Sequence, residues 1–233
     1  MTEKIENLNT KNEYRNRELS WLQFNARVLQ EAEDPSVPLI ERLRFLGIFS
    51  NNLDEFFKVR YATVRRIVEA GKGGRSFLGG ISASELLEEI TQIVIEQQAH
   101  SLRILKKIRS ELHKENIYII NETEVTKAQS EFILDYFIRK VSPALVTIMI
   151  GELEEFPSLK DSAAYLAVRM VMKKDDDTFQ SRSNFALIEI PKVIDRFIVL
   201  PQKGDKQYII ILDDLIRYCL NNIFSIFKYE SIS

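Results

Sequence analysis

The sequence predicts a multidomain chain, with an all-α helical domain over residues 1–115 and an α+β domain over residues 116–233. A length of 233 residues, 45% of them hydrophobic, is enough for two modest cores. Apolar residues recur at helical spacing through the first half, whereas short β-rich runs dominate the second. Because these strands follow one another without a helix between each pair, we expect a mixed or antiparallel sheet rather than a doubly wound one.

The first helix is expected to start at Ser20, because Ser20 can cap the backbone and Gln23 can reach back to it. Asp34 and Pro35 are expected to end this helix. The apolar stripe that should face the core repeats at helical spacing, with Trp21, Phe24 and Val28, and continues toward Ala32.

A second helix is expected from Pro38, since the first turn of a helix does not need the N–H that proline lacks. Ser50, Asn51 and Asn52 then stand together, and their short polar side chains compete for hydrogen bonds with the backbone. We therefore expect a break here, before helical spacing resumes at Leu53.

A glycine-rich segment from Gly71 to Gly80 is expected to be a mobile connection, with Lys72 and Arg75 near its middle. It follows a helix rather than a strand and has no Gly-Lys-Ser/Thr ending, so it is not built as a phosphate loop. A plain linker is the first interpretation, and contact of the two cations with an anion is the alternative.

The next helix carries the strongest signal of the chain. Ser82 and Glu85 match a capping box, and an apolar face continues to about Glu115. The residues expected on this face are Leu86, Ile90, Ile93, Val94, Leu105, Ile108 and Leu112.

In the second half, Ile117–Ile120 is expected to be a strand, followed by a helix over residues 132–141 that Pro143 limits. A polar turn is expected over residues 173–178 and a closing helix over residues 213–227. The remaining strands are expected at Tyr165–Met172 and at residues 185–190, 197–200 and 208–212.

The charge of the chain is nearly balanced, with 32 Lys and Arg against 34 Asp and Glu and a net charge of −2. We therefore expect no global field that recruits nucleic acid or a membrane. The polar start up to Arg17 lacks the apolar stretch of a signal peptide, and no apolar run is long enough for a membrane span. A cytoplasmic location is expected, with peripheral membrane association left open.

A self-contained active site is not evident among the reactive residue types. His100 and His113 lie too far apart on one helix for a two-histidine metal site, so both are interpreted as solvated helix residues. Cys219 is the single cysteine, and it is interpreted as a small core residue rather than as a nucleophile.

Acidic residues cluster without forming an evident catalytic pair. Asp54 and Glu55 are adjacent, so they point in different directions on a helix, and we expect them to lie at the positive end of the helix that they begin. Glu154 and Glu155 are also adjacent, and on a helix they too would point in different directions. The run Asp175 to Asp177 is interpreted as a solvated turn, with metal binding as the alternative. No magnesium ligands are assigned.

Three spaced motifs carry a family resemblance. They are RELSWLQFN at residues 17–25, PLIERLRFLGI at 38–48 and SNNLDEF at 50–56. Together they resemble the amino-terminal domain of the larger, histidine-phosphorylated bacterial polyphosphate kinase. The second half adds YLAV at 165–168, ALIEIP at 186–191 and LDDLIRYCL at 212–220, which are similar to the head domain of that family.

The resemblance implies a function. Members of the family reversibly transfer the terminal phosphate of ATP to inorganic polyphosphate, through a phosphohistidine held by two further domains that resemble phospholipase D. It further implies Mg²⁺, ATP and ADP as ligands and a homo-oligomer, a dimer or tetramer, joined through the head domain. By this resemblance the chain is a fragment whose head domain is truncated, with the catalytic histidine beyond Ser233, so we expect it to be inactive alone.

One site residue is carried over by the resemblance. The second asparagine of the SNNLDEF motif contacts ATP on the adenine side in the family, and it corresponds to Asn52. An amide suits adenine, because its oxygen can accept from the exocyclic amine while its NH2 donates to a ring nitrogen. The structural alternative is that Asn51 or Asn52 only caps the following helix.

A second function remains open from the sequence. The chain could be a non-catalytic helical interaction module, in which the long helix around Leu86 to Leu112 docks a partner protein and nucleotide has no role.

Overall fold

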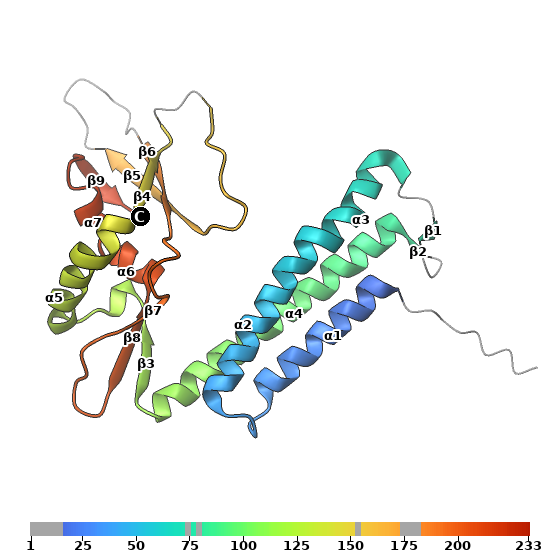
Figure 1. Cartoon of the computed structure of the whole chain (residues 1–233), viewed down its shortest axis with the longest axis horizontal. Coiled ribbons are helices and arrows are strands. Elements are labelled where there is room, and N and C mark those ends of the chain that lie inside the picture. The colour runs from blue at the N-terminus through green and yellow to red at the C-terminus, as the bar shows by residue number, and fades with distance from the viewer. Residues whose placement is uncertain (1–15, 73–75, 78–80, 152–154, 173–182) are drawn as a thin grey trace, which may run out of the picture. The chain divides into compact units, whose positions relative to one another are not determined.

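The computed structural model describes residues 16–72, 76–77, 81–151, 155–172 and 183–233 (Figure 1). The chain divides into two compact units, Met1–Leu112 and His113–Ser233. In the described residues the first unit is helical apart from one short hairpin, and the second combines helices with sheets of three and four strands. The expected fold classes are therefore confirmed.

In its described part, the first unit consists of helical rods that run side by side (Figure 1). One rod is α1 (Arg17–Glu33), and another is α4 (Ala83–Lys114). The rod between them in sequence consists of α2 (Leu39–Phe56), the π-helical turn η1 (Phe57–Tyr61) and α3 (Ala62–Ile67), and it leads into η2 (Val68–Lys72), which is kinked at Gly71.

Helix α1 begins earlier than expected. Its N-cap is Asn16, whose Oδ1 accepts hydrogen bonds from the backbone N–H of Glu18 at 2.8 Å and of Leu19 at 3.4 Å. The prediction that Ser20 caps the helix is therefore wrong, because Asn16 satisfies these free N–H groups one turn earlier. The helix ends at Glu33 with Asp34 as its C-cap, as expected.

The buried face of α1 is also not the expected stripe. Phe24 keeps 59% of its surface exposed, and Trp21 and Val28 are only half-buried. The residues that α1 buries are Leu22, Asn25, Leu29 and Ala32. A polar residue on this face interrupts the apolar pattern, which is why spacing of hydrophobic residues alone selected the wrong side.

The break expected at Ser50 to Asn52 does not form. Helix α2 runs through these residues and buries Leu46, Phe49 and Leu53 at helical spacing. Burial of this face outweighs the weak helix preference of three polar residues. Asn51 and Asn52 therefore cap no helix, and the capping alternative for Asn52 is wrong.

Helix α4 begins with the expected capping box. Ser82 Oγ accepts from the N–H of Glu85 at 3.2 Å, and Glu85 Oε2 accepts from the N–H of Ser82 at 2.9 Å. The glycine-rich segment before it is described only in part, where β1 (Ser76–Phe77) pairs antiparallel with β2 (Ile81–Ser82). Gly71 has a φ of 69°, a left-handed conformation that suits glycine.

The apolar face of α4 packs inside its own unit. Gln97 Nε2 donates to the carbonyl of Leu22 in α1 at 3.0 Å, and the apolar side chains beside it are almost fully buried. These side chains are Leu86, Ile90, Val94, Ile104, Ile108 and Leu112. This face is therefore covered by its own unit, whereas Ile95 and Leu102 on the same helix keep 55% and 59% of their surfaces exposed.

The second unit contains a mixed and an antiparallel sheet. In the three-stranded sheet, β3 (Ile117–Ile120) pairs parallel with β8 (Gln207–Ile211), which pairs antiparallel with β7 (Phe197–Val199). The four-stranded sheet is antiparallel in the order β4 (Val146–Met149), β6 (Ser183–Glu189), β5 (Tyr165–Met172) and β9 (Tyr229–Ile232). The expected preference for a mixed or antiparallel arrangement is confirmed.

Short helices complete the core of the second unit. They are η3 (Glu122–Glu124), α5 (Lys127–Tyr136), η4 (Phe137–Val141), η5 (Ser142–Ala144), α6 (Leu212–Tyr218) and α7 (Leu220–Ile223). Ile133, Val168, Ile188, Ile210 and Leu215 are nearly inaccessible and belong to one cluster that joins helices and strands. The prediction of a single closing helix over residues 213–227 is wrong. The helix is interrupted at Cys219, and α7 ends at Ile223, before the chain forms β9.

Candidate functional site

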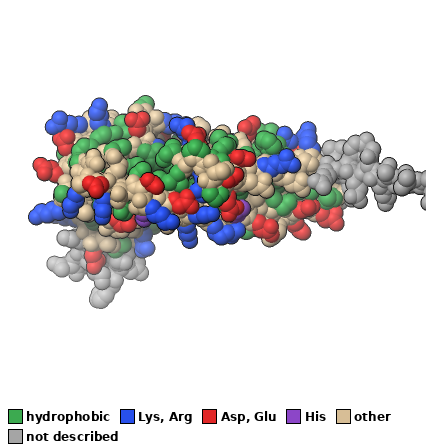
Figure 2. All heavy atoms as spheres, turned by 90° about the horizontal axis from the view of Figure 1, so that it is seen from below, with side chains coloured by type: hydrophobic (Ala, Val, Ile, Leu, Met, Phe, Trp, Pro, Cys, Tyr) green, Lys and Arg blue, Asp and Glu red, His purple; other side chains and the backbone are tan. Residues whose placement is uncertain are grey.

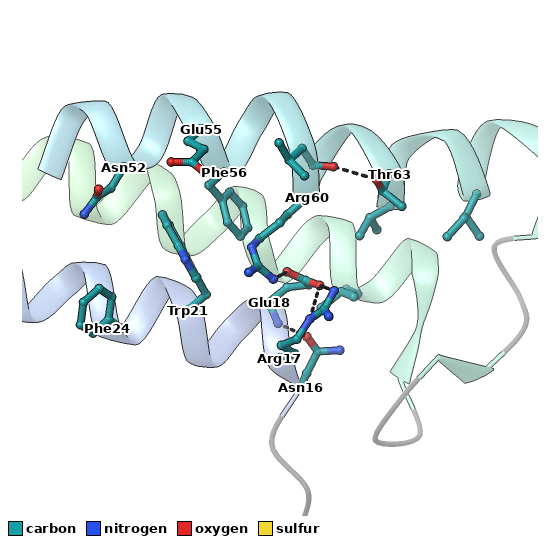
Figure 3. A pocket seen from close by; sticks show the side chains of 14 residues that line it. Asn16, Arg17, Glu18, Trp21, Phe24, Asn52, Glu55, Phe56, Arg60 and Thr63 are labelled. Carbon is teal, nitrogen blue, oxygen red and sulfur yellow. Dashed lines mark hydrogen bonds and ion pairs between the residues drawn. The ribbon is translucent and has the colours of Figure 1, made fainter. Parts of the chain in front are cut away.

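A pocket of about 450 Å³ lies in the first unit, between the start of α1 and the rod formed by α2, η1 and α3 (Figure 3). It is the place where Asn52, predicted from the sequence, is found. The residues that line it are Asn16, Arg17, Glu18, Trp21, Phe24, Asn52, Glu55, Phe56, Val59, Arg60, Thr63, Val64, Ile67 and Leu86.

Aromatic side chains form one wall of the pocket. The rings of Trp21 and Phe56 stack with their centroids 5.0 Å apart and their planes 24° apart. Phe56 is 1% exposed and anchors the stack in the core, whereas Phe24 is largely open to solvent. Stacked and partly open rings offer a flat, polarisable surface to a planar ligand.

A cluster of charged side chains lies beside this aromatic wall. Arg60 Nη1 lies 2.9 Å from Glu18 Oε2, and the Arg60 guanidinium carbon lies 5.9 Å from the centre of the Trp21 ring. Arg17 also contacts Glu18, at 3.0 Å. Arg60 belongs to the π-helical turn η1, and such turns occur often at functional sites.

The pocket carries as many acidic as basic side chains. Arg17 and Arg60 are balanced by Glu18 and Glu55, and Glu18 is engaged by both arginines. A triphosphate needs an excess of positive charge, which these four side chains do not supply. The arrangement therefore suits a neutral, planar group better than an anionic one.

Two asparagines from different helices form a hydrogen-bonded chain at the inner side of the pocket. Asn52 Nδ2 donates to Asn25 Oδ1 at 3.1 Å, and Asn25 Nδ2 donates to the backbone carbonyl of Phe49 at 3.3 Å. Asn25 is fully buried, whereas Asn52 is half-buried and lines the pocket. Figure 3 shows the Asn52 side chain reaching from α2 toward α1.

Most of these neighbours were not singled out from the sequence. The sequence places Trp21 on the expected core stripe, and it predicts no site role for Glu18 or Arg60. A signal was present, because Glu18 and Trp21 lie in the first of the resembling motifs and Asn52 lies in the third. The pocket brings these two motifs together.

The two histidines are solvated residues with specific neighbours. His100 Nε2 lies 3.0 Å from Glu33 Oε2, and the His113 ring stacks on Tyr118 with centroids 4.9 Å apart. Both side chains remain accessible to solvent on α4, as expected, and each also has a specific partner. Neither lines the pocket of the first unit.

The acidic residues next to the third motif also differ from expectation. Asp54 and Glu55 lie in the last turn of α2 and begin no helix. Asp54 pairs instead with Lys58 one turn later, at 2.6 Å, while Glu55 lines the pocket. Continuation of the helix removes the free N–H groups that would have attracted these carboxylates.

Several candidates lie outside the described residues. These are Arg75, Glu154, the run Asp175 to Asp177 and the side chain of Lys72. Over the rest of the chain, no three His, Cys, Asp or Glu side chains gather as a metal site would need. In that same part, no helix is long and apolar enough to cross a membrane.

Surface charge is mixed on both units. Figure 2 shows basic and acidic side chains interspersed over the visible face. This distribution agrees with the net charge of −2, and it leaves local geometry rather than a long-range field to select a ligand.

Comparison with known proteins places both units in one family. Residues 14–120 match the family described as Polyphosphate kinase N-terminal domain, and residues 128–233 match the family described as Polyphosphate kinase middle domain. Polyphosphate kinase of Vibrio vulnificus strain YJ016 is 39% identical over 227 residues, which cover 94% of this chain and 31% of that protein. Polyphosphate kinase of Bacillus anthracis is 36% identical over 230 residues, covering 98% and 33%.

A solved structure shares the fold. The crystal structure of polyphosphate kinase from Porphyromonas gingivalis matches with a TM-score of 0.76 at 27% identity, over 93% of this chain and 31% of that chain. The chain thus spans 31% to 33% of the length of these relatives. Because the two matched domains account for most of its residues, the chain belongs to the polyphosphate kinase family and carries the N-terminal and middle domains of that family.

Proposed function

We propose that the pocket of the first unit binds the adenine base of ATP, with Asn52 as the residue that recognises it. In this proposal the chain is the nucleotide-binding part of a polyphosphate kinase, which transfers the terminal phosphate of ATP reversibly to inorganic polyphosphate. The relatives named above carry the name polyphosphate kinase.

The observation that carries the proposal is the position of one side-chain amide beside a stack of aromatic rings. Asn52 lines the same pocket as Trp21 and Phe56. An adenine ring offers two flat faces for stacking and an edge with donors and acceptors for an amide. Apolar walls with a few placed polar groups are typical of sites for small organic ligands.

The balanced charge of the pocket supports separate sites for the base and for the phosphates of ATP. Base recognition belongs to this pocket, and the phosphates are held elsewhere, by groups that bring positive charge. The phosphohistidine that the family resemblance implies is proposed to belong to the remainder of the enzyme. By itself this chain is expected to give no transfer in a polyphosphate-synthesis assay.

Magnesium is also proposed to bind outside this pocket. The family resemblance implies Mg²⁺, which prefers several oxygen ligands at once. Glu18 is already held by two arginines, and Glu55 is the other carboxylate in the pocket. These residues do not fit a magnesium site, so no step is assigned to the metal in this chain.

Two neighbouring asparagines provide a matched test of the proposal in the full-length enzyme. Asn52→Ala removes the amide from the pocket and is expected to raise the KM for ATP about tenfold, by the loss of one or two hydrogen bonds. Asn51→Ala changes the same residue type one position earlier, where the side chain is exposed, and should leave KM unchanged. Equal kinetics for the two folded variants would refute the role of Asn52.

The second unit is proposed to contribute to self-association. A homo-oligomer, a dimer or tetramer, is expected from the family resemblance, and edge strand β7 supports a contact between copies. Phe197 and Val199 on β7 keep 52% and 54% of their surfaces exposed, and Val193 before it keeps 84%. Exposed apolar groups on an unpaired edge favour contact with another chain. A cytoplasmic location, where ATP is available, completes the proposal.

A further inference from the structure

The Asn25 side chain has a direction that its partners impose. A backbone carbonyl can only accept hydrogen bonds, so the group that Asn25 turns toward the Phe49 carbonyl must be its NH2. Its oxygen then faces Asn52, at 3.1 Å from Nδ2. The orientation of both amides therefore follows from this chain of donors and acceptors.

The same argument sets the direction of Asn52. Because Asn25 presents an acceptor, Asn52 must present its NH2 on that side. Among the described residues, Asn52 Oδ1 has no hydrogen-bond partner, so it remains available on the pocket side. Turning the amide over would bring two carbonyl oxygens together in a buried place, which is unfavourable.

We infer that Asn25 is a positioning residue, which holds the Asn52 amide with its oxygen available to the ligand, so that the pocket selects a base with a donor at position 6. This inference rests on the proposed function and goes beyond it. A 6-aminopurine such as adenine offers an N–H to this oxygen, whereas a 6-oxopurine opposes it with a second acceptor. Complete burial of Asn25 keeps solvent from replacing either partner.

The chain contains its own reporter for the test. Trp21 is the single tryptophan and lies in the pocket, stacked on Phe56 and close to Arg60. A base that enters the pocket changes the surroundings of the indole, and hence its fluorescence. Excitation at the red edge of the tryptophan band avoids absorption by the nucleotides themselves.

The experiment titrates the chain with ATP and with ITP, which carries a 6-oxo group where ATP carries the 6-amino group. Wild-type chain is expected to bind ITP about tenfold more weakly than ATP, because one hydrogen bond is replaced by a repulsive contact. Asn25→Leu keeps the number and branching of the side-chain heavy atoms but removes the acceptor. The Asn52 amide can then turn either way, and the ratio of the two affinities should fall toward one.

Asn25→Asp is the conservative control. In either protonation state, the carboxyl group leaves an acceptor for Asn52 Nδ2, so the preference for ATP should survive even where stability falls. If Asn25 served folding alone, Asn25→Leu would weaken the binding of ATP and ITP equally and leave the ratio of their affinities unchanged. Circular dichroism confirms that each variant is folded.

The outcomes separate the two proposals. A Trp21 signal with ATP and the predicted ratios supports the inference. Equal affinity of the wild-type chain for ATP and ITP overturns it, whether or not Asn25→Leu folds, and leaves the nucleotide site standing. An unchanged ratio in folded Asn25→Leu also overturns it. No Trp21 response to any nucleotide overturns the proposed adenine pocket and this inference with it.

Discussion

The side chains that line the pocket already have partners within the chain, and these partners determine which groups remain available to a ligand. Glu18 is held by Arg17 and Arg60, so its carboxylate is neutralised before any ligand arrives. Asn52 gives its NH2 to Asn25 and keeps its oxygen. The pocket therefore offers a ligand one oriented amide and one aromatic surface, a combination that favours the proposed binding of a base over that of a phosphate.

Cys219 is a residue whose chemistry the structure suppresses. Burial raises the pKa of its thiol to about 12, from 9.0. We expect no reaction with a thiol reagent at neutral pH while the chain is folded, and full reaction after denaturation. Rapid labelling of the native chain would contradict this expectation.

The raised pKa of Cys219 also predicts a dependence of stability on pH. The folded thiol holds its proton more tightly than the unfolded one, so its contribution is fully present below pH 9 and is lost as pH rises toward 12. Urea unfolding of the wild type and of Cys219→Ala between pH 8 and about pH 11 measures this effect. The wild type should lose more free energy of unfolding over this range, and parallel curves would contradict the assignment.

The helices of the first unit show what sequence patterns can and cannot predict. The capping box of Ser82 and Glu85 was predicted because it is local and reciprocal, with both bonds made within three residues. The continuity of α2 across Asn52 could not be predicted, since the amide finds its partner on another helix, at Asn25. Local preferences assume that such a side chain competes with its own backbone.

The prediction of the buried face of α1 was wrong for a related reason. The spacing of hydrophobic residues predicts that Phe24 is buried, but Phe24 is exposed at the pocket. Asn25, which this spacing does not select, is buried instead. Phe24 lines the candidate pocket and Asn25 is bonded to Asn52 in its lining, and departures from local sequence patterns are expected at functional sites. In the second unit, by contrast, β5 spans Tyr165–Met172 as predicted. The four-residue edge strands β4 and β9 are not predicted from the sequence.

Helix α2 is tied to its neighbours by a buried arginine. Arg42 is 2% exposed, its Nε donates to the carbonyl of Ala32 at 2.9 Å, and its Nη1 lies 2.5 Å from Glu111 Oε2. Arg42→Ala should lower the free energy of unfolding by about 3 kcal/mol, because it removes these bonds and leaves a cavity.

Arg44 provides the matched control on the same helix. Its side chain is 69% exposed and, among the described residues, pairs with Glu41 alone, so Arg44→Ala should cost less than about 0.5 kcal/mol. Chemical denaturation of both variants measures the difference. Similar losses for the two would mean that the buried contacts of Arg42 add no stability.

For the whole molecule, self-association through the second unit is the property most open to test. Phe197→Lys on β7 places a charge on the proposed contact, whereas Phe185→Lys on β6 changes an equally exposed phenylalanine of the other sheet. Light scattering should report multiples of the 27.1 kDa chain for the wild type and for Phe185→Lys, and the single mass for Phe197→Lys. A wild-type chain that stays at the single mass at high concentration would contradict the proposal.

The proposed nucleotide site depends most on where the purine ring of ATP lies. Intermolecular nuclear Overhauser effects between ATP and the chain measure this directly, since the adenine H2 and H8 protons and the indole protons of Trp21 are each easily recognised. We predict cross-peaks from adenine to Trp21 and to the side-chain amide of Asn52. Saturable binding of ATP, with every cross-peak and shift outside the residues of this pocket, would contradict the central claim.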